Sequence, residues 1–225
     1  MLTIKSSLRD IILGGQDGLV NVLGVVLGVS AATSDLKIII ISGLAATFAE
    51  SISMAAVAYT STEASQSKYM SDLKEEEHEV DTTPEEGKKE VEQVFKEWGF
   101  DGDLLNQAVQ KIVSNKATWT KFMMSEGRLE TGSTENPYSS SLIVGLSSLF
   151  GSFVPLLPFL ILKTPQTAIV YSFTISAAFL FLLGAVKAKL TVGNPLGSGL
   201  KITAIGIASA IVGFMIGKLL GGSNL

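Results

Sequence analysis

Five long apolar runs restrict what this chain can fold into more than any other feature. They cover residues 11–32, 37–60, 140–162, 166–186 and 202–220. Each run is close to the roughly 20 residues that a helix needs to cross the hydrocarbon of a bilayer. Only helices and closed barrels satisfy their backbone hydrogen bonds in lipid, and these continuous runs lack the alternation of barrel strands. The sequence therefore predicts an all-α, polytopic membrane protein with five transmembrane helices surrounded by membrane lipid.

The charged residues gather in one segment between the second and third runs. Residues 61–136 hold 17 of the 21 acidic and 9 of the 17 basic side chains of the 225-residue chain. Such an acidic segment belongs in water, attracts cations and repels nucleic acid. We therefore predict three parts: transmembrane helices 1 and 2 in residues 1–60, an acidic helical insert in residues 61–136, and transmembrane helices 3–5 in residues 137–225.

The basic residues beside the apolar runs predict the orientation of the chain. With the N-terminus inside, the inner flanks hold Lys5, Arg9, Lys187, Lys189 and Lys201. The outer flanks then hold Lys37, Lys163 and Lys218. Because lysine and arginine accumulate in cytoplasmic loops, this bias favours a cytoplasmic N-terminus and a cytoplasmic insert.

The insert is expected to form three helices, the first of which can continue the second transmembrane helix. Thr83, Pro84 and Glu86 have the spacing of a capping box at the start of the next helix, which is expected to end at Gly99. We expect Asp103 to cap the third helix. Its apolar residues recur at helical spacing: Leu105, Val109, Ile112 and Phe122.

Small residues recur at the spacing that lets membrane helices approach closely. Gly24 and Gly28 form one G-x-x-x-G motif, and Gly213 and Gly217 form another. Such motifs mark contacts between subunits in some proteins and ordinary packing in others, so both interpretations stay open.

Two carboxylates lie well inside the apolar runs, Asp17 in the first and Glu50 in the second. An ionised carboxylate at mid-bilayer costs roughly 2.5–3.5 kcal/mol, and no lysine or arginine lies in the interior of any run. The two groups must therefore be protonated, hydrated or paired with a cation from outside the chain. Met54 shares a helical face with Glu50, and a carboxylate with a thioether suits iron(II) better than calcium or magnesium.

Carboxylates and thioethers at helical spacing make the insert a candidate metal-binding domain. Glu75 and Glu76 precede Glu79 by four and three residues, and Glu86 and Glu90 lie four apart. The third helix adds Met123, Met124, Glu126 and Glu130. Like charges at this spacing destabilise a helix unless a cation or solvent screens them. A metal site and a solvated acidic face both remain possible.

Enzyme chemistry has little support in the sequence. Glu75 and His78 fit the i, i+3 motif of di-iron carboxylate bundles, but such sites need two motifs and this chain has one histidine. The absence of cysteine excludes thiolate metal sites and cysteine catalysis. We therefore expect a protein that is not an enzyme, with a membrane-bound iron oxidase as the weakest alternative.

In order along the chain, these features resemble the vacuolar iron transporter family. The segments that carry the resemblance are "GGQDGLVNVLGVVLGV", "AESISMAAVAY", "WTKFMMSEGRLE" and "GSFVPLLPFL". The resemblance implies a homodimer that moves iron(II), and often manganese(II), out of the cytoplasm in exchange for protons. The metals are then substrates, and no cofactor is permanently bound. It also implies the plasma membrane of a prokaryote or the vacuolar membrane of a eukaryote.

The resemblance assigns expected roles to individual residues. Asp17, Glu50 and Met54 match the ion path. In the insert, which is expected to collect the metal, the matching ligands are Glu76, Glu79, Met123 and Met124.

The insert also departs from the family pattern. The second family pair is Glu-x-x-Glu, whereas Glu86 and Glu90 are four apart, and Gly87 stands where the pattern leads us to expect a glutamate. The glutamate that follows the double methionine is displaced by one residue, to Glu126. A membrane-anchored metal sensor is the alternative function. The acids in the apolar runs discriminate between the two, because a sensor needs the insert but has no need of Asp17 and Glu50.

Overall fold

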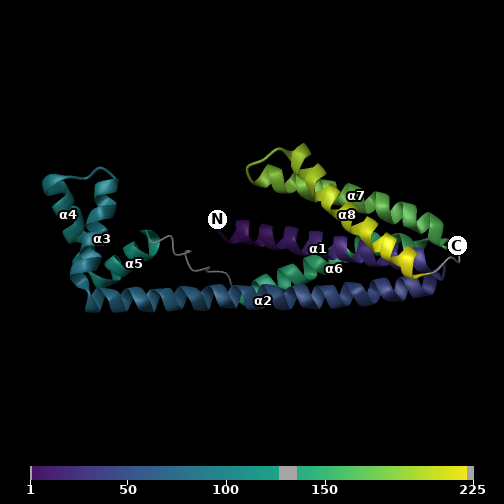
Figure 1. Cartoon of the computed structure of the whole chain (residues 1–225), viewed down its shortest axis with the longest axis horizontal. Coiled ribbons are helices and arrows are strands. Elements are labelled where there is room, and N and C mark those ends of the chain that lie inside the picture. Colours follow the sequence, from purple (N-terminus) through teal and green to yellow (C-terminus); the bar gives the residue numbers. More distant parts are fainter. Residues whose placement is uncertain (1, 127–135, 222–225) are drawn as a thin grey trace. The chain divides into compact units, whose positions relative to one another are not determined.

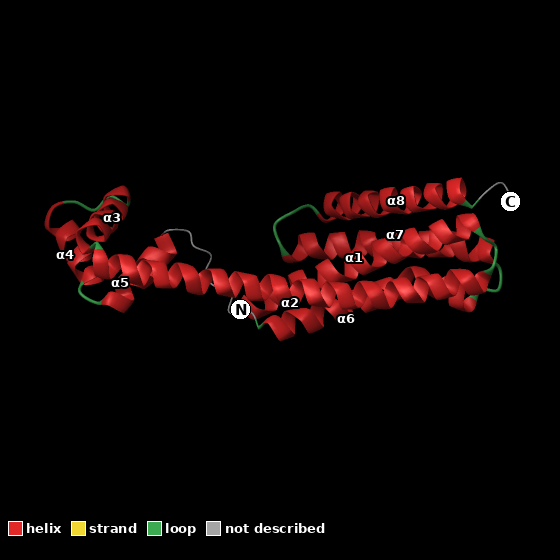
Figure 2. Cartoon of the chain, turned by 60° about the horizontal axis from the view of Figure 1, so that its bottom comes forward, coloured by secondary structure: helices red, strands yellow, loops and turns green. Residues whose placement is uncertain are grey.

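The computed structural model describes residues 2–126 and 136–221, and every regular element in these residues is an α-helix (Figures 1 and 2). The helices are α1 (Leu2–Ala32), α2 (Leu36–Thr82), α3 (Pro84–Glu97), α4 (Gly102–Val113), α5 (Lys116–Glu126), α6 (Pro137–Ile161), α7 (Pro165–Leu190) and α8 (Pro195–Leu220). The predicted all-α class is confirmed.

Five of the described helices are long and apolar enough to span a membrane, namely α1, α2, α6, α7 and α8. The prediction of five spans is therefore confirmed. Their ends differ from the apolar runs because the helices continue into polar sequence. Most of the added length is in α2, which runs on to Thr82, and in α8, which begins at Pro195 rather than near residue 202. Proline suits the first helical position, because an N–H group there would have no intrahelical acceptor and its absence costs no hydrogen bond.

The chain divides into two compact units, which are described separately below. The first contains residues 1–59 and 137–225, and the second contains residues 60–136. Helix α2 is continuous and contributes residues to both units.

Helix α1 occupies the centre of the first unit. It contacts α6, α7 and α8 along its length, and α7 in turn contacts α6 and α8 (Figures 1 and 2). Side chains from four helices form the largest buried apolar cluster of this unit: Val22, Val26, Ile39, Leu156, Phe159 and Ala168. Burial on this scale fixes the rotation of α1, and with it the direction in which its polar residues face.

Glycines in the first half of α1 allow α6 to approach it closely. A Cβ atom added to Gly14 would overlap the carbonyl oxygen of Val144, and one added to Gly18 would overlap that of Ser148. Small residues permit such backbone contact between membrane helices. The N-terminal half of α1 therefore packs on α6.

Glycines in the second half of α1 pair with those of α8. A Cβ atom on Gly28 would stand 2.8 Å from the carbonyl oxygen of Gly213, and one on Gly217 would overlap that of Gly28. The two G-x-x-x-G motifs thus meet within one chain. This contact explains them as intramolecular packing, so they do not by themselves indicate an oligomer contact.

The second unit has its own small apolar core beyond the membrane-spanning part of α2. Its buried residues are Val91, Phe95, Leu105, Val109 and Trp119. The four apolar residues that recur at helical spacing all belong to this core, because Ile112 and Phe122 pack against the buried cluster.

Three details of the predicted insert helices are wrong, and two of them concern the third helix. The expected third helix is divided into α4 and α5 at Ser114 and Asn115, and the Asn115 side chain accepts a hydrogen bond from the Thr118 N–H at 3.0 Å. An asparagine that caps a new helix competes with continuation of the old one. Helix α4 also starts earlier than expected, because Asp101 rather than Asp103 holds the N-cap position.

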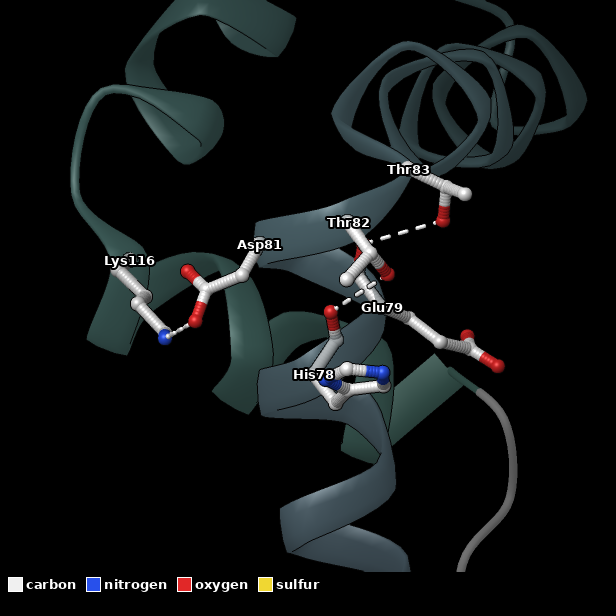
Figure 3. A network of polar contacts seen from close by, with 6 residues as sticks. All are labelled: His78, Glu79, Asp81, Thr82, Thr83 and Lys116. Carbon is white, nitrogen blue, oxygen red and sulfur yellow. Dashed lines mark hydrogen bonds and ion pairs between the residues drawn. The ribbon is translucent and has the colours of Figure 1, made fainter.

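The start of α3 lacks the predicted capping box. Thr83 holds the N-cap position and Pro84 the first helical position, as expected, but the Thr83 side chain makes no capping hydrogen bond. Its hydroxyl group instead donates to the Glu79 carbonyl oxygen at 3.1 Å (Figure 3). The threonine therefore terminates α2 instead of capping α3.

The end of α3 is set by Gly99, as expected. Gly99 has a φ of +88°, which glycine adopts without steric penalty. Its N–H donates to the Lys96 carbonyl oxygen, and the Phe100 N–H donates to that of Phe95. This pair of bonds is a Schellman motif. It turns Phe100 back onto Phe95, with ring centroids 5.2 Å apart.

Candidate functional site

Three polar side chains meet where α1 and α2 lie together in the first unit. Asn21 donates a hydrogen bond from Nδ2 to Asp17 Oδ2 at 3.4 Å. The carboxyl group of Glu50 lies against the side chains of both Asp17 and Asn21. The structure thus brings together the two carboxylates that the sequence singled out. Asn21 was missed, although an amide one helical turn from Asp17 in an apolar run was a visible signal.

No basic side chain neutralises these carboxylates in the part of the chain that the structure describes. Its three ion pairs all lie within residues 60–126: Lys68–Asp72, Lys96–Glu92 and Lys116–Asp81. Met54 is half-buried one turn beyond Glu50 on α2. Two adjacent carboxylates without a countercharge attract a cation, so this arrangement suits a metal ion or protons.

A further carboxylate, which is buried whereas Asp17 and Glu50 are half-buried, was not expected from the sequence. Asp10 is only 7% exposed, and the Ser140 hydroxyl group of α6 donates a hydrogen bond to its Oδ2 at 2.8 Å. Asp10 precedes Asp17 by seven residues, which places both on one side of α1 two turns apart. Asp10 precedes the first apolar run, which begins at residue 11. Helical spacing from Asp17 was the signal that could have identified it.

Five of the predicted insert ligands line a common cavity of about 290 Å³ in the second unit. The glutamates come from the end of α2 and from α3, and α5 supplies one aromatic ring and one thioether. The side chains are Glu76, Glu79, Glu86, Glu90, Trp119 and Met123. The cavity is therefore an acidic depression with one soft donor atom at its wall.

The glutamates of this cavity do not form a ready coordination shell. Among the described residues, no three aspartate, glutamate or histidine side chains stand close enough to hold one metal ion. Long glutamate side chains can change rotamer at modest cost. A bound cation would therefore require these side chains to turn toward one another.

Electrostatics of the cavity favour a cation all the same. Burial raises the pKa of the Glu76 carboxyl group, and the negative charges of Glu79, Glu90 and Glu75 raise it further. A carboxylate whose charge is disfavoured in this way gains from a positive ion nearby.

The remaining predicted ligands lie elsewhere. Glu75 is exposed and does not line the cavity, and Met124 is buried with 5% exposure. The Glu126 side chain and Glu130 lie outside the residues whose side chains the structure describes. His78 is exposed, so its pairing with Glu75 in a buried di-iron site has no support from this geometry.

An ion pair on the other side of α2 ties the insert together. Lys116 at the start of α5 binds Asp81 near the end of α2, while the Glu79 side chain points away from this pair (Figure 3). The bond links residues 35 positions apart in sequence. It holds α5, which carries Trp119 and Met123, against the helix that carries Glu79.

Comparison with known proteins shows which family the chain belongs to. The model of the VIT family matches residues 8–218. The chain belongs to the VIT family. It is similar to vacuolar iron transporter 1 of Arabidopsis thaliana, with 28% identity over 96% of this chain and 87% of the relative. It is also similar to the vacuolar iron transporters of Centaurea cyanus, with 29% identity over 96% and 89%, and of Plasmodium falciparum, with 27% identity over 96% and 83%.

Membership of the VIT family confirms the resemblance found in the sequence, and the structure gives a reason for one departure from its expected pattern. Gly87 lies against the indole ring of Trp119, and a Cβ atom added there would stand 3.1 Å from the ring carbon Cζ2. A glutamate at this position would have to displace the ring. Trp119 thus occupies the space beside the fourth helical position of α3 in this VIT protein.

Proposed function

We propose that the protein is a membrane transporter, not an enzyme, that moves iron(II) out of the cytoplasm in exchange for protons. Manganese(II) is the expected second cargo. The names of the relatives, vacuolar iron transporters of plants and of Plasmodium, support iron as the substrate. The contact between the Glu50 carboxyl group and Asp17 within two apolar helices is the observation that carries the proposal.

The physical basis for coupling is the cost of a bare charge in the membrane. An ionised carboxylate at the bilayer centre costs roughly 2.5–3.5 kcal/mol. Two such groups in contact repel each other as well. In this proposal the pair therefore always holds a cation, and a metal ion leaves only when protons replace it. Asn21 donates to Asp17 and would orient that carboxylate in either state.

In this proposal, the acid-lined cavity of the insert captures the metal. Its glutamates attract a divalent ion, and Met123 adds a thioether that favours a softer transition metal over calcium or magnesium. The N-terminus and insert would face the cytoplasm, the working unit would be a homodimer, and the membrane would be the vacuolar membrane in a eukaryote or the plasma membrane in a prokaryote.

Metal uptake by proteoliposomes tests the proposal directly. The purified protein is reconstituted into vesicles with an acidic lumen and a trapped metal-sensitive dye, and iron(II) is added outside under reducing conditions. We expect uptake that stops when an ionophore dissipates the proton gradient. Uptake that is indifferent to the gradient would contradict proton coupling while leaving iron transport intact.

The same assay separates the transporter from the alternative. A membrane-anchored sensor would bind iron(II) through the insert but move none across the membrane. Vesicles that show no uptake, made with protein that still binds iron(II), would therefore favour the sensor. Empty vesicles, and vesicles tested with magnesium(II), serve as controls for leakage and for selectivity.

A further inference from the structure

A cavity of about 480 Å³ lies at the turn between α7 and α8, and neither the metal path nor the insert uses it. Its polar wall comes from three helices: Gln16 of α1, Lys187 of α7, and Ser198 and Lys201 of α8. This volume is in the range of pockets that hold small-molecule ligands. The cavity lies where one candidate membrane-spanning helix ends and the next begins, and the ends of helices of this length reach the headgroup region of a bilayer.

The two lysines of this cavity have no countercharge within the described residues. All ion pairs of the described chain are formed by other lysines. Lys187 and Lys201 are also separated by the turn, yet both side chains face the same cavity. Because like charges repel unless an anion or solvent stands between them, the pair attracts a negatively charged group.

The start of α8 adds a second attraction for an anion. Asn194 holds the N-cap position and its side chain accepts the Leu196 N–H, while the Ser198 N–H donates to the Asn194 carbonyl oxygen. The Gly197 N–H lies between these two and has no acceptor among the described residues. A free N–H at a helix N-terminus, where the helix dipole is positive, is a favourable partner for phosphate oxygens.

Close packing holds the polar wall in place. A Cβ atom added to Gly184 of α7 would stand 2.6 Å from the Ser198 carbonyl oxygen, so the first turn of α8 rests directly on α7. The Thr191 hydroxyl group donates to the Lys187 carbonyl oxygen at 2.7 Å and closes the end of α7. The two lysines therefore project from a fixed backbone, which lowers the entropic cost of binding.

Apolar side chains also line part of the cavity. Ile202 and Ile205 complete its wall on α8, and Ile205 is 51% exposed. Val192 in the turn is fully exposed. A cavity lined by two lysines and by apolar side chains fits a molecule with a phosphate group on a hydrocarbon body better than a free inorganic ion.

We propose that this cavity binds the phosphate group of an anionic phospholipid, with Lys187, Lys201 and the Gly197 N–H as its partners. The proposal does not depend on the transport function. Its ligand contacts Gln16, the residue directly before Asp17, and so bridges α1 to the α7–α8 turn. The lipid would stabilise the packing of α1, α7 and α8 against one another.

Thermal unfolding of the full chain in detergent, titrated with lipid, tests the site. We expect phosphatidylglycerol to raise the unfolding temperature and zwitterionic phosphatidylcholine to have much less effect. Each lysine near an anionic headgroup strengthens binding about fivefold, so the Lys187→Gln/Lys201→Gln variant should need roughly 25-fold more phosphatidylglycerol. The matched control is Lys189→Gln, since Lys189 is exposed at the same end of α7 but does not line the cavity.

Further arms of the experiment identify the source of the phosphate and guard against misfolding. If inorganic phosphate alone gives the full protection, the site stands but its ligand is a soluble phosphate. The single variants should each show about a fivefold loss, and Lys187→Arg/Lys201→Arg should keep the response because both charges remain. Equal protection of the wild type and the Gln variants, or no protection of the wild type by either ligand, would overturn the proposal.

Discussion

The carboxyl group of Glu50 on α2 lies against the Asp17 side chain on α1, and Asn21 donates a hydrogen bond to that same aspartate. Two carboxylates in contact within apolar helices cannot both stay ionised without a cation. We therefore expect the two residues to act as one unit in cation binding. Neither is expected to retain the function of the pair without the other.

Replacing either member of this pair should abolish metal transport. We expect Asp17→Asn and Glu50→Gln each to reduce iron(II) uptake by proteoliposomes to the level of empty vesicles. The double variant should be no worse than either single one, because residues that act as a unit are not additive. The variants should still elute as folded protein, since each replacement keeps size and polarity.

The matched control is Asp35→Asn, which lies between α1 and α2. Asp35 Oδ1 accepts the Lys37 N–H at 2.8 Å and so caps α2. Asparagine caps helices equally well, and the control should keep the wild-type rate. Full transport by Asp17→Asn would refute the assigned role of the carboxylate pair.

The buried hydrogen bond between Ser140 and Asp10 should contribute to stability. Ser140→Ala leaves the Asp10 carboxyl group buried without its donor, which costs about 1–3 kcal/mol. Ser139→Ala is the matched control, because Ser139 is exposed one residue earlier. Thermal unfolding in detergent measures both. In a double-mutant cycle with Asp10→Ala, which removes the acceptor, the two changes should cost less together than the sum of their separate costs. Additive costs would show that the bond has no energetic weight.

The glycine contact between α1 and α8 predicts opposite outcomes for two alanine substitutions. Gly217→Ala should destabilise the fold by about 1–3 kcal/mol or more, because its Cβ atom would overlap the backbone of Gly28. Gly24→Ala should be close to neutral, since the nearest atom to its Cβ position is Ser209 Oγ at 3.7 Å. Thermal unfolding compares the two. A Gly217→Ala protein of unchanged stability but altered oligomeric state would instead favour a contact between subunits.

The sequence was most informative where one physical constraint dominates. The bilayer sets a length for apolar helices, so five spans could be counted directly, and the cost of a buried charge singled out Asp17 and Glu50. The helix ends were less predictable. The apolar runs mark the hydrocarbon, whereas α8 begins at its own signals, the Asn194 cap and Pro195.

Features that depend on which helices are neighbours could not be predicted. Both glycine motifs were visible, but nothing local shows that Gly28 meets Gly213 within one chain. The bond from Ser140 to Asp10 spans 130 positions in sequence. In the insert, the spacing of the glutamates predicted the lining of the cavity. The contact between the Trp119 ring and Gly87 follows only from tertiary packing.

Glu76 should make the stability of the insert depend on pH and metal in a characteristic way. Burial and neighbouring carboxylates raise its pKa above the ordinary value of 4.5. A raised pKa means that the folded state binds the proton more tightly than the unfolded state does. The folded state is therefore favoured at low pH and loses stability as the pH rises from 4.5 through the raised pKa. Glu76→Gln removes this penalty.

Without metal, Glu76→Gln should therefore unfold at a higher temperature than the wild type at pH 7, and the difference should vanish below about pH 4.5. Manganese(II) should reverse the order, because an ion that binds only the folded wild type stabilises it by about 2.7 kcal/mol at 100 times its dissociation constant. Both tryptophans of the chain, Trp98 and Trp119, lie in the insert, so their fluorescence follows its unfolding. Glu77→Gln, exposed and outside the cavity, should resemble the wild type throughout. Equal stabilisation of the wild type and Glu76→Gln by manganese(II) would show that the cavity is a solvated acidic surface and not a metal site.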